Sequence, residues 1–207
     1  MTSDLHFGHI NIITYTHRPF ADVDEMDEAL VQTWNETVRP DDTVWVLGDV
    51  CMGRIEHSLG LVAQLHGTRL LLSGNHDRTF RPARPVGATG APPDRWERAY
   101  RDAGFAAIER GSIEIDIGLA EPTLACHFPY RGDSHADDRY PEHRPVDHGR
   151  PLLHGHTHGA WMQHQLMVDV GVDTWAGRPV NADHVAALLA AGAAELGPLP
   201  WTRVGAD

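Results

Sequence analysis

Cysteine is scarce in this sequence, and long apolar runs are absent. The chain of 207 residues has two cysteines, Cys51 and Cys126, which is too few for a disulfide framework and suits a reducing compartment. We expect both to be small buried apolar residues. No apolar stretch approaches the length that crosses a bilayer, and the chain reaches a polar motif by Asp4, so no signal peptide is visible. The sequence therefore predicts a cytoplasmic protein without a membrane partner.

Positive charge is also scarce. The 17 basic residues face 29 acidic ones, which gives a formal net charge of −12. Binding to duplex nucleic acid requires a basic face, so we do not expect this class of partner. A phosphate substrate is still compatible with the acidic chain, because bound divalent cations would reverse the sign of the charge locally.

The length and composition are those of one folded domain, residues 1–207. The chain is 42% hydrophobic and 22% charged, which is typical of a globular domain with a sizeable core. We see no internal repeat and no linker. Three residues precede Asp4, which favours either a very short first strand or a segment upstream of Met1.

Apolar periodicity predicts that strands and helices alternate. Residues 43–47 and 69–73 are short apolar runs, typical of parallel strands covered on both faces. Residues 21–38 carry an apolar side chain at every fourth position, which predicts a helix that Asp22 or Asp24 can cap. This order predicts an α/β layered fold with functional residues at the carboxyl ends of its strands. The other expected elements are helices at 55–65, 94–103 and 181–191, strands at 112–117, 123–126, 152–154 and 165–172, and loops at 80–93 and 131–150.

Several of these strands end in residue types that bind metal ions. In two of the motifs the candidate ligands are two residues apart, so in an extended backbone their side chains point to the same side. A single such motif is weak, because a histidine at a strand end is more often structural. Together the motifs predict one pocket at which five chain segments meet: Asp4-Leu5-His6, Gly48-Asp49, Gly74-Asn75-His76-Asp77, Cys126-His127 and Gly155-His156-Thr157-His158.

The types of donor narrow the choice of ion. Carboxylate, imidazole and one amide oxygen, without sulfur, suit Mn, Fe, Zn or Co. Their number is right for two ions that share one bridging carboxylate. Two ions roughly 3.5–4 Å apart can clamp both ends of an in-line displacement at phosphorus.

In this order, the five motifs resemble those of the calcineurin-like metallophosphoesterases. The chain is also similar to small bacterial and phage members of that superfamily, which share three further motifs. The resemblance covers most of the chain and implies a four-layer αββα sandwich with two mixed β-sheets. The three motifs are Ser3-Asp4-Leu5-His6-Phe7-Gly8-His9, Arg18-Pro19-Phe20 and Val170-Gly171-Val172-Asp173-Thr174-Trp175.

The resemblance also implies a role for each candidate residue. His76 would not be a ligand but the general acid that protonates the leaving oxygen. The cofactors would be two divalent ions, Mn²⁺ first, with Fe, Zn, Co and Ni as alternatives. The implied ligands are Asp4, His6 and His158 for the first ion, Asn75, His127 and His156 for the second, and Asp49 as the bridge.

One position departs from a subclass of that superfamily. Its phosphoprotein phosphatases have an aspartate three residues after the Gly-Asp aspartate, where it orients the catalytic histidine; this chain has Met52. We therefore do not expect a phosphoprotein phosphatase. Asp77 or His9 could orient His76 instead, although Asp77 is better suited to fix its own loop through backbone hydrogen bonds.

The function expected is hydrolysis of small phosphodiesters, such as cyclic nucleotides, by attack of a metal-held hydroxide. A phosphomonoesterase acting on nucleotides or phosphopeptides is the nearest alternative. A catalytically silent scaffold stabilised by metal is an alternative of another class, but it would have no need of His76. A nuclease subunit is disfavoured by the acidic charge.

Four further residues are candidates for contacting the substrate: His9, Arg18, Tyr130 and Arg131. Each is individually more typical of a solvated surface group. The tripeptide Arg131-Gly132-Asp133 matches an adhesion motif, which we attribute to chance. The oligomeric state stays open, with a dimer possible through the alternating strand at 112–117.

Overall fold

The computed structural model describes residues 1–80 and 95–201. Most of the loop expected at 80–93 therefore lies outside the described residues. Within them the helices are α1 (Ile10–Tyr15), α2 (Val23–Thr37), α3 (Ile55–Val62), α4 (Arg95–Asp102), α5 (Ala182–Ala191) and a short 3-10 helix, η1 (Pro141–His143). The strands are β1 (Thr43–Val46), β2 (Thr68–Leu72), β3 (Phe105–Glu109), β4 (Ser112–Ile115), β5 (Thr123–Cys126), β6 (Leu152–His154), β7 (Gln163–Gln165), β8 (Met167–Asp169) and β9 (Ala194–Leu196).

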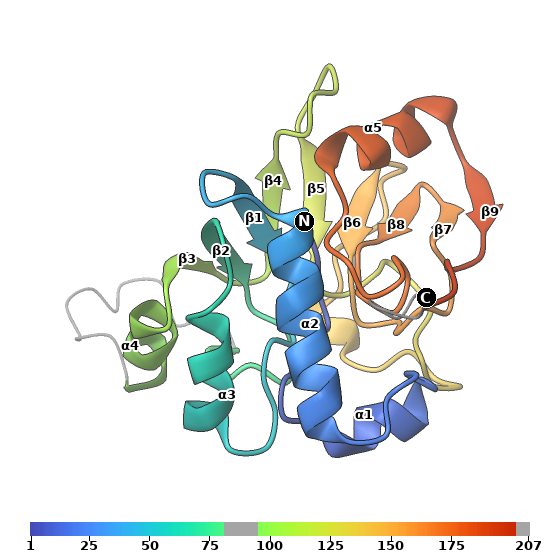
Figure 1. The fold of residues 1–207 in the computed structure, drawn as a ribbon. Helices are drawn as coiled ribbons and strands as arrows, with labels where there is room; N and C mark the ends of the chain where they lie inside the picture. Colours follow the sequence, from blue (N-terminus) through green and yellow to red (C-terminus); the bar gives the residue numbers. More distant parts are fainter. Residues whose placement is uncertain (81–94, 202–207) are drawn as a thin grey trace.

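The strands form two sheets, as Figure 1 shows. The first has the order β1-β2-β3, and both of its strand pairs are parallel. The resemblance implied that both sheets are mixed, and this is wrong for the three-stranded sheet. Its connections explain the difference, because α3 lies between β1 and β2 and α4 lies between β2 and β3 in the chain, and a helical crossover joins parallel neighbours.

The second sheet is mixed and has the order β4-β5-β6-β8-β7-β9. Its centre, β5-β6-β8, is parallel, and β4 runs antiparallel to β5 as its alternating sequence predicts. The single strand expected at 165–172 is instead two antiparallel strands, β7 and β8. The chain reverses there because Gln165 adopts a left-handed conformation with a φ of 55°. The expected elements did not include α1, β3 or β9.

The N-terminal segment lies between the two sheets (Figure 1). Thr2 forms a parallel bridge with Val46 next to β1, and Ser3 forms one with Gly171 beyond β8. The short first strand expected here is thus reduced to isolated bridges. Its position places Asp4 and the residues after it at the edge where both sheets present the ends of their strands.

The described residues form three apolar clusters, and the two larger ones hold the layers together. In the first, α2 and α3 cover one face of the parallel sheet, and the expected stripe on α2 is buried: Met26, Leu30, Trp34 and Val38. In the second, residues of both sheets and α5 meet. Asp22 accepts the N–H of Glu25 at the start of α2, and Asn181 accepts that of Asp183 at the start of α5, so both expected caps form.

Both cysteines are buried and unpaired, as expected. Among the described residues, no helix combines the length and the apolar character needed to cross a membrane.

Candidate metal centre

The structure brings candidate ligands from separate motifs together in two overlapping groups. Donor atoms of Asp4, His6 and His158 lie within 4.8 Å of one another, and so do those of Asp4, Asp49 and His127. Both groups could hold a metal ion. One oxygen faces both of them, because Asp49 Oδ2 lies 3.7 Å from His6 Nε2 and 3.5 Å from His127 Nε2.

In each carboxylate of the centre, one oxygen is anchored and the other is free. Asp4 Oδ2 accepts hydrogen bonds from the Ser3 hydroxyl and from the backbone N–H of His156, and Asp49 Oδ1 accepts the backbone N–H of His76 at 2.8 Å. Asp4 Oδ1 and Asp49 Oδ2 are buried and have no hydrogen-bond partner. An unpaired buried oxygen costs about 1–3 kcal/mol, more when charged. A cation would satisfy both of these oxygens.

The histidines show the same pattern. Both ring nitrogens of His6 and Nδ1 of His158 are buried without a hydrogen-bond partner. His127 Nδ1 lies 2.7 Å from the carbonyl oxygen of Leu47, which can only accept, so Nδ1 carries a proton and Nε2 is the nitrogen available to a metal ion once the ring is neutral. That atom lies 3.1 Å from Asn75 Oδ1. An N–H held by a backbone carbonyl is the usual way in which a metal-binding histidine is oriented.

The buried carboxylates of the centre stabilise positive charge on the neighbouring imidazoles. Burial alone would raise the pKa of Asp49, but His127 and His6 outweigh it and hold the pKa well below its usual value. Burial lowers the pKa of His127, and the carboxylates of Asp49 and Asp4 outweigh it and raise the pKa to about 10. A divalent cation would supply the same positive charge in place of the imidazole proton.

The backbone at the centre is unusual. Five candidate ligands have a left-handed φ: Asp4 at 55°, His6 at 54°, Asp49 at 55°, His156 at 70° and His158 at 49°. Asp4 and His6 do point to the same site, as expected, but the expected cause, an extended backbone, is wrong. Their side chains meet because both residues are left-handed. Such a conformation costs of order 1 kcal/mol per residue and tends to cluster at functional sites.

Close packing explains the glycines that precede the ligands. A Cβ atom at Gly74 would collide with the carboxylate of Asp49, and one at Gly155 would collide with the carboxylate of Asp4. Each glycine thus lets one ligand segment approach the side chain of another.

His156 is held by a residue that the sequence analysis set aside. Its Nε2 lies 2.8 Å from Asp133 Oδ2, and its ring centroid lies 5.3 Å from that of His127. The Asp133 side chain is fully buried, and Arg139 and Arg144 both donate to it. The matching tripeptide thus contains a residue that orients a candidate ligand, His156. The only sequence signal was an acidic residue a few positions after His127 in a long loop.

Arg18 lies in the interior and not at the pocket surface. Its guanidinium donates to both oxygens of Asp173, at 2.8 and 2.9 Å, and to the carbonyl oxygens of Asp4 and Leu5. Asp173 Oδ2 in turn lies 3.6 Å from Nδ1 of His158. Because the Arg18 side chain is completely buried, the expected substrate contact does not fit. Arg18 instead holds the backbone of the first motif and pairs with Asp173, whose carboxylate lies beside the candidate ligand His158.

His76 differs from the ligands in its exposure. Its side chain is 34% exposed, and Nε2 lies 4.0 Å from Asp49 Oδ2. Asp77 does not orient its ring, because its carboxylate accepts the backbone N–H groups of Asp49, Val50 and Gly74. The role that we preferred for Asp77, bracing its loop, is confirmed. His9 is the other candidate, and its ring centroid lies 6.4 Å from that of His76.

A cavity of about 680 Å³ opens onto the centre. Five candidate ligands line it: His6, Asp49, Asn75, His156 and His158. The lining also includes His76, His9 and two walls, which are α1 with the residue after it and the loop after His127. Tyr130 and Arg131 are not part of that lining. Tyr130 donates to the carbonyl of Arg150, and Arg131 pairs with Asp147 at 2.9 Å. The residues on the two walls that the sequence analysis did not select are Ile12, Tyr15, Thr16, Asp133, Ser134, His135 and Arg139.

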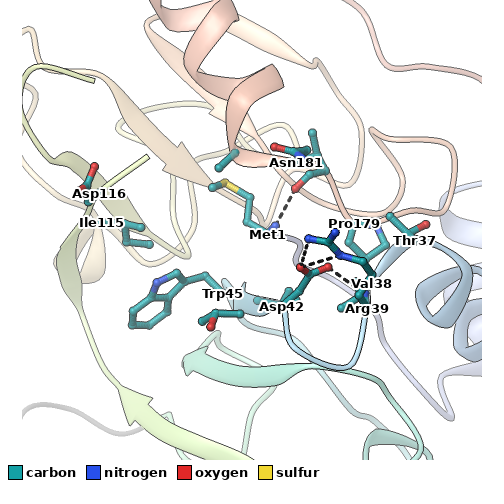
Figure 2. Close-up of a pocket in the computed structure, with 14 residues that line it drawn as sticks. Met1, Thr37, Val38, Arg39, Asp42, Trp45, Ile115, Asp116, Pro179 and Asn181 are labelled. Atoms are coloured by element: carbon teal, nitrogen blue, oxygen red, sulfur yellow. Dashed lines mark hydrogen bonds and ion pairs between the residues drawn. The ribbon is translucent and has the colours of Figure 1, made fainter. Parts of the chain in front are cut away.

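A second cavity, of about 600 Å³, surrounds the N-terminus (Figure 2). The ammonium group of Met1 donates to the carbonyl oxygen of Val180 at 2.7 Å, and Arg39 pairs with Asp42 nearby. Of the described residues that line it, none is a candidate ligand or substrate contact.

Fold and site together define an α/β protein with two sheets and with Asp/His groups that could hold a metal. No family model matches the chain. It is 35% identical over 195 residues to the Gene 66 protein of Mycobacterium phage L5, covering 89% of this chain and 90% of that protein. It is 35% identical over 183 residues to the Gene 66 protein of Mycobacterium phage D29, with coverage of 84% and 87%. The chain therefore belongs to the family of these phage Gene 66 proteins.

A solved structure has a similar fold. It is a protein of unknown function from Aquifex aeolicus, with a TM-score of 0.65 and 20% sequence identity over 91% of this chain and 97% of that one. At this identity the likeness extends to the fold alone.

Proposed function

We propose that this protein is a dinuclear metal-dependent phosphoesterase of the calcineurin-like kind. The observation that carries the proposal is the set of buried, unpartnered donor atoms that converge around Asp4 and Asp49. We further propose that the two sheets and their helices form the four-layer αββα sandwich of that superfamily. The apolar core between the sheets and the helices outside the parallel sheet support this arrangement.

The residues present fit a pair of ions. Asp4, His6 and His158 would hold one of them, and Asp49 Oδ2 faces the histidines on both sides. Asn75, His127 and His156 would complete the other. Two divalent ions, Mn²⁺ first and Fe, Zn, Co or Ni as alternatives, would supply charge stabilisation for a phosphoryl group and lower the pKa of water.

His76 has the position of a proton donor. It sits between the buried ligands and the cavity, with its ring centroid 5.4 Å from that of His6. The hydrogen bond from its backbone N–H to Asp49 fixes the distance between the residue and the centre. We propose that its imidazole protonates the departing oxygen of the substrate.

The substrate class we propose is a small phosphodiester, with cyclic nucleotides as one example. A cavity of about 680 Å³ is of the size that accepts a small molecule. Monoesters of nucleotides or phosphopeptides are the alternative, and a metal-stabilised scaffold without activity is the alternative of another class.

A comparison of two chromogenic esters tests these options. Protein loaded with Mn²⁺ should hydrolyse bis(nitrophenyl) phosphate faster than nitrophenyl phosphate, and EDTA should abolish both activities. The opposite preference would favour the phosphomonoesterase. Binding of two equivalents of Mn²⁺ without hydrolysis of either ester, or of a panel of cyclic nucleotides, would identify a scaffold.

A further inference from the structure

We propose that Arg139 is the residue through which this pocket binds the anionic oxygens of its substrate, and that Asp133 holds it there. The inference rests on the proposed function, because it assigns the phosphoester contact of the same site. Neither residue was selected from the sequence as a substrate contact.

The first argument is the charge of the pocket wall. Of the described residues that line the cavity, Arg139 is the one with a permanent positive charge. All 17 basic residues of the chain are arginines, whose planar guanidinium can donate two parallel hydrogen bonds to a phosphate. The two arginines that the sequence suggested as substrate contacts do not line the cavity. Arg18 is buried, and Arg131 is paired with Asp147 outside it.

The second argument is a charge balance around Asp133. Its one carboxylate accepts hydrogen bonds from two guanidinium groups, Arg139 at 2.7 Å and Arg144 at 3.0 Å. One positive charge is therefore left over. It belongs to Arg139, because the Arg144 side chain is 6% exposed and the Arg139 side chain is 35% exposed.

Arg144 is fully used in holding the loop. It donates to the carbonyl oxygens of Pro129, Gly132 and Arg139 as well as to Asp133. Arg139, by contrast, donates through Nε and Nη2 to Asp133 and through Nη2 to Ser134. Its Nη1 has no hydrogen bond among the contacts of the described residues. This nitrogen belongs to a side chain that is 35% exposed and is the donor left for a ligand.

The third argument is the connection to the metal centre. The carboxylate that grips Arg139 also accepts from Nε2 of His156, at 2.8 Å. One buried aspartate thus fixes both a candidate metal ligand and the guanidinium. Asp133 therefore sets the position of the Arg139 charge relative to the proposed metal site.

The test uses the full chain loaded with Mn²⁺ and three variants: Arg139→Ala, Arg139→Lys and Arg131→Ala. Arg131 is the matched control, since it lies in the same loop, is ion-paired and exposed, and does not line the cavity. The measurements are the dissociation constant of inorganic phosphate by calorimetry, the KM and kcat for bis(nitrophenyl) phosphate, and the bound Mn²⁺ by elemental analysis.

We expect Arg139→Ala to weaken phosphate binding about 10-fold to 100-fold, which is the loss of a charged hydrogen bond. The KM should rise in parallel, the Mn²⁺ content should stay at the wild-type value, and Arg139→Lys should recover part of the loss. Arg131→Ala should differ from wild type by less than about twofold, as for an exposed pair.

Three results would overturn the inference. Phosphate affinity and KM of Arg139→Ala within about twofold of wild type would remove Arg139 from the substrate while leaving the proposed function intact. Loss of Mn²⁺ together with phosphate would mean that Arg139 acts through Asp133 on His156. A wild-type protein that neither hydrolyses the diester nor binds phosphate would end both the inference and the proposed function.

Discussion

At the scale of single residues, the histidines of the centre fall into three kinds. His6 and His127 are buried and direct ring nitrogens toward the carboxylate of Asp49. His156 Nε2 lies 2.8 Å from the carboxylate of Asp133, whereas His158 Nδ1 has no hydrogen bond and lies 3.6 Å from the carboxylate of Asp173. His76 is partly exposed at the cavity. The residue type is the same in each, so the surroundings decide its role.

Replacing His76 by alanine separates proton transfer from metal binding. We expect the kcat for a phosphodiester to fall by about 10²–10⁴, the typical contribution of a general acid. Bound Mn²⁺ should not change, because the contact between His76 and Asp49 that sets the loop is made by the backbone N–H, which alanine keeps. Activity equal to wild type would remove His76 from the mechanism.

Replacing Asp133 by asparagine tests the support of His156. The affinity for Mn²⁺ should fall by about 10-fold to 100-fold, as for the loss of a hydrogen-bond partner of a ligand. Asp147→Asn is the control, since Asp147 is in the same loop, is paired with Arg131 and is partly exposed. Calorimetric titration with Mn²⁺ measures both variants, and equal affinities would contradict a special role of Asp133.

At the scale of elements, Arg18 connects parts of the chain that are far apart in sequence. It follows α1, binds the backbone of the first motif at Asp4 and Leu5, and pairs with Asp173 after β8. Breaking such a buried pair on one side leaves a buried charge without its partner. No local pattern pointed to this role, because an arginine near a polar motif is usually solvated.

Arg18→Ala should lower the free energy of unfolding by about 3–5 kcal/mol, measured by urea titration. Arg39→Ala, which breaks an exposed pair with Asp42, should lower it far less, because solvent screens the two charges. Similar losses in the two variants would show that the Arg18 pair adds nothing beyond a surface contact.

The same pair predicts a dependence of stability on pH. Burial alone would raise the pKa of Asp173, but Arg18 outweighs it and lowers the pKa to about 2. The pair's contribution is therefore complete above the ordinary pKa of about 4 and is lost as the pH falls toward 2. Urea titrations between these pH values should show a smaller decline in Arg18→Ala than in the wild-type protein.

At the scale of the whole molecule, the centre lies where separate layers meet. Asp4 comes from the segment between the sheets, Asp49 follows β1 of the parallel sheet, and His127 and His156 follow β5 and β6 of the mixed sheet. Each brings buried charge or unpaired lone pairs to this junction. Metal binding should therefore stabilise the complete fold and not one element alone.

Adding Mn²⁺ at 100 times its dissociation constant should stabilise the protein by about 2.7 kcal/mol per independent site. The melting temperature in a calorimeter should rise accordingly, and EDTA should reverse the change. Asp49→Ala should show little or no rise, because the oxygen facing both groups is removed. A rise in this variant equal to that of wild type would mean that Asp49 does not bridge.

The sequence by itself determined the features that local chemistry controls. The apolar stripe of α2, the caps at Asp22 and Asn181, and the order of motifs at the strand ends follow from periodicity and residue type over a few positions. These signals also singled out the residues that converge around Asp4 and Asp49.

Tertiary structure alone decided the features that depend on distant partners. Asp133 became the support of His156, Arg18 was drawn into the interior, and Arg139 took the place on the pocket wall that Arg131 was expected to have. The left-handed backbone of the ligands belongs here too, since packing between segments holds a conformation that local preference disfavours. The physical reason is that burial and charge pairing are set by contacts across more than a hundred residues, as between Arg18 and Asp173, and no local pattern encodes them.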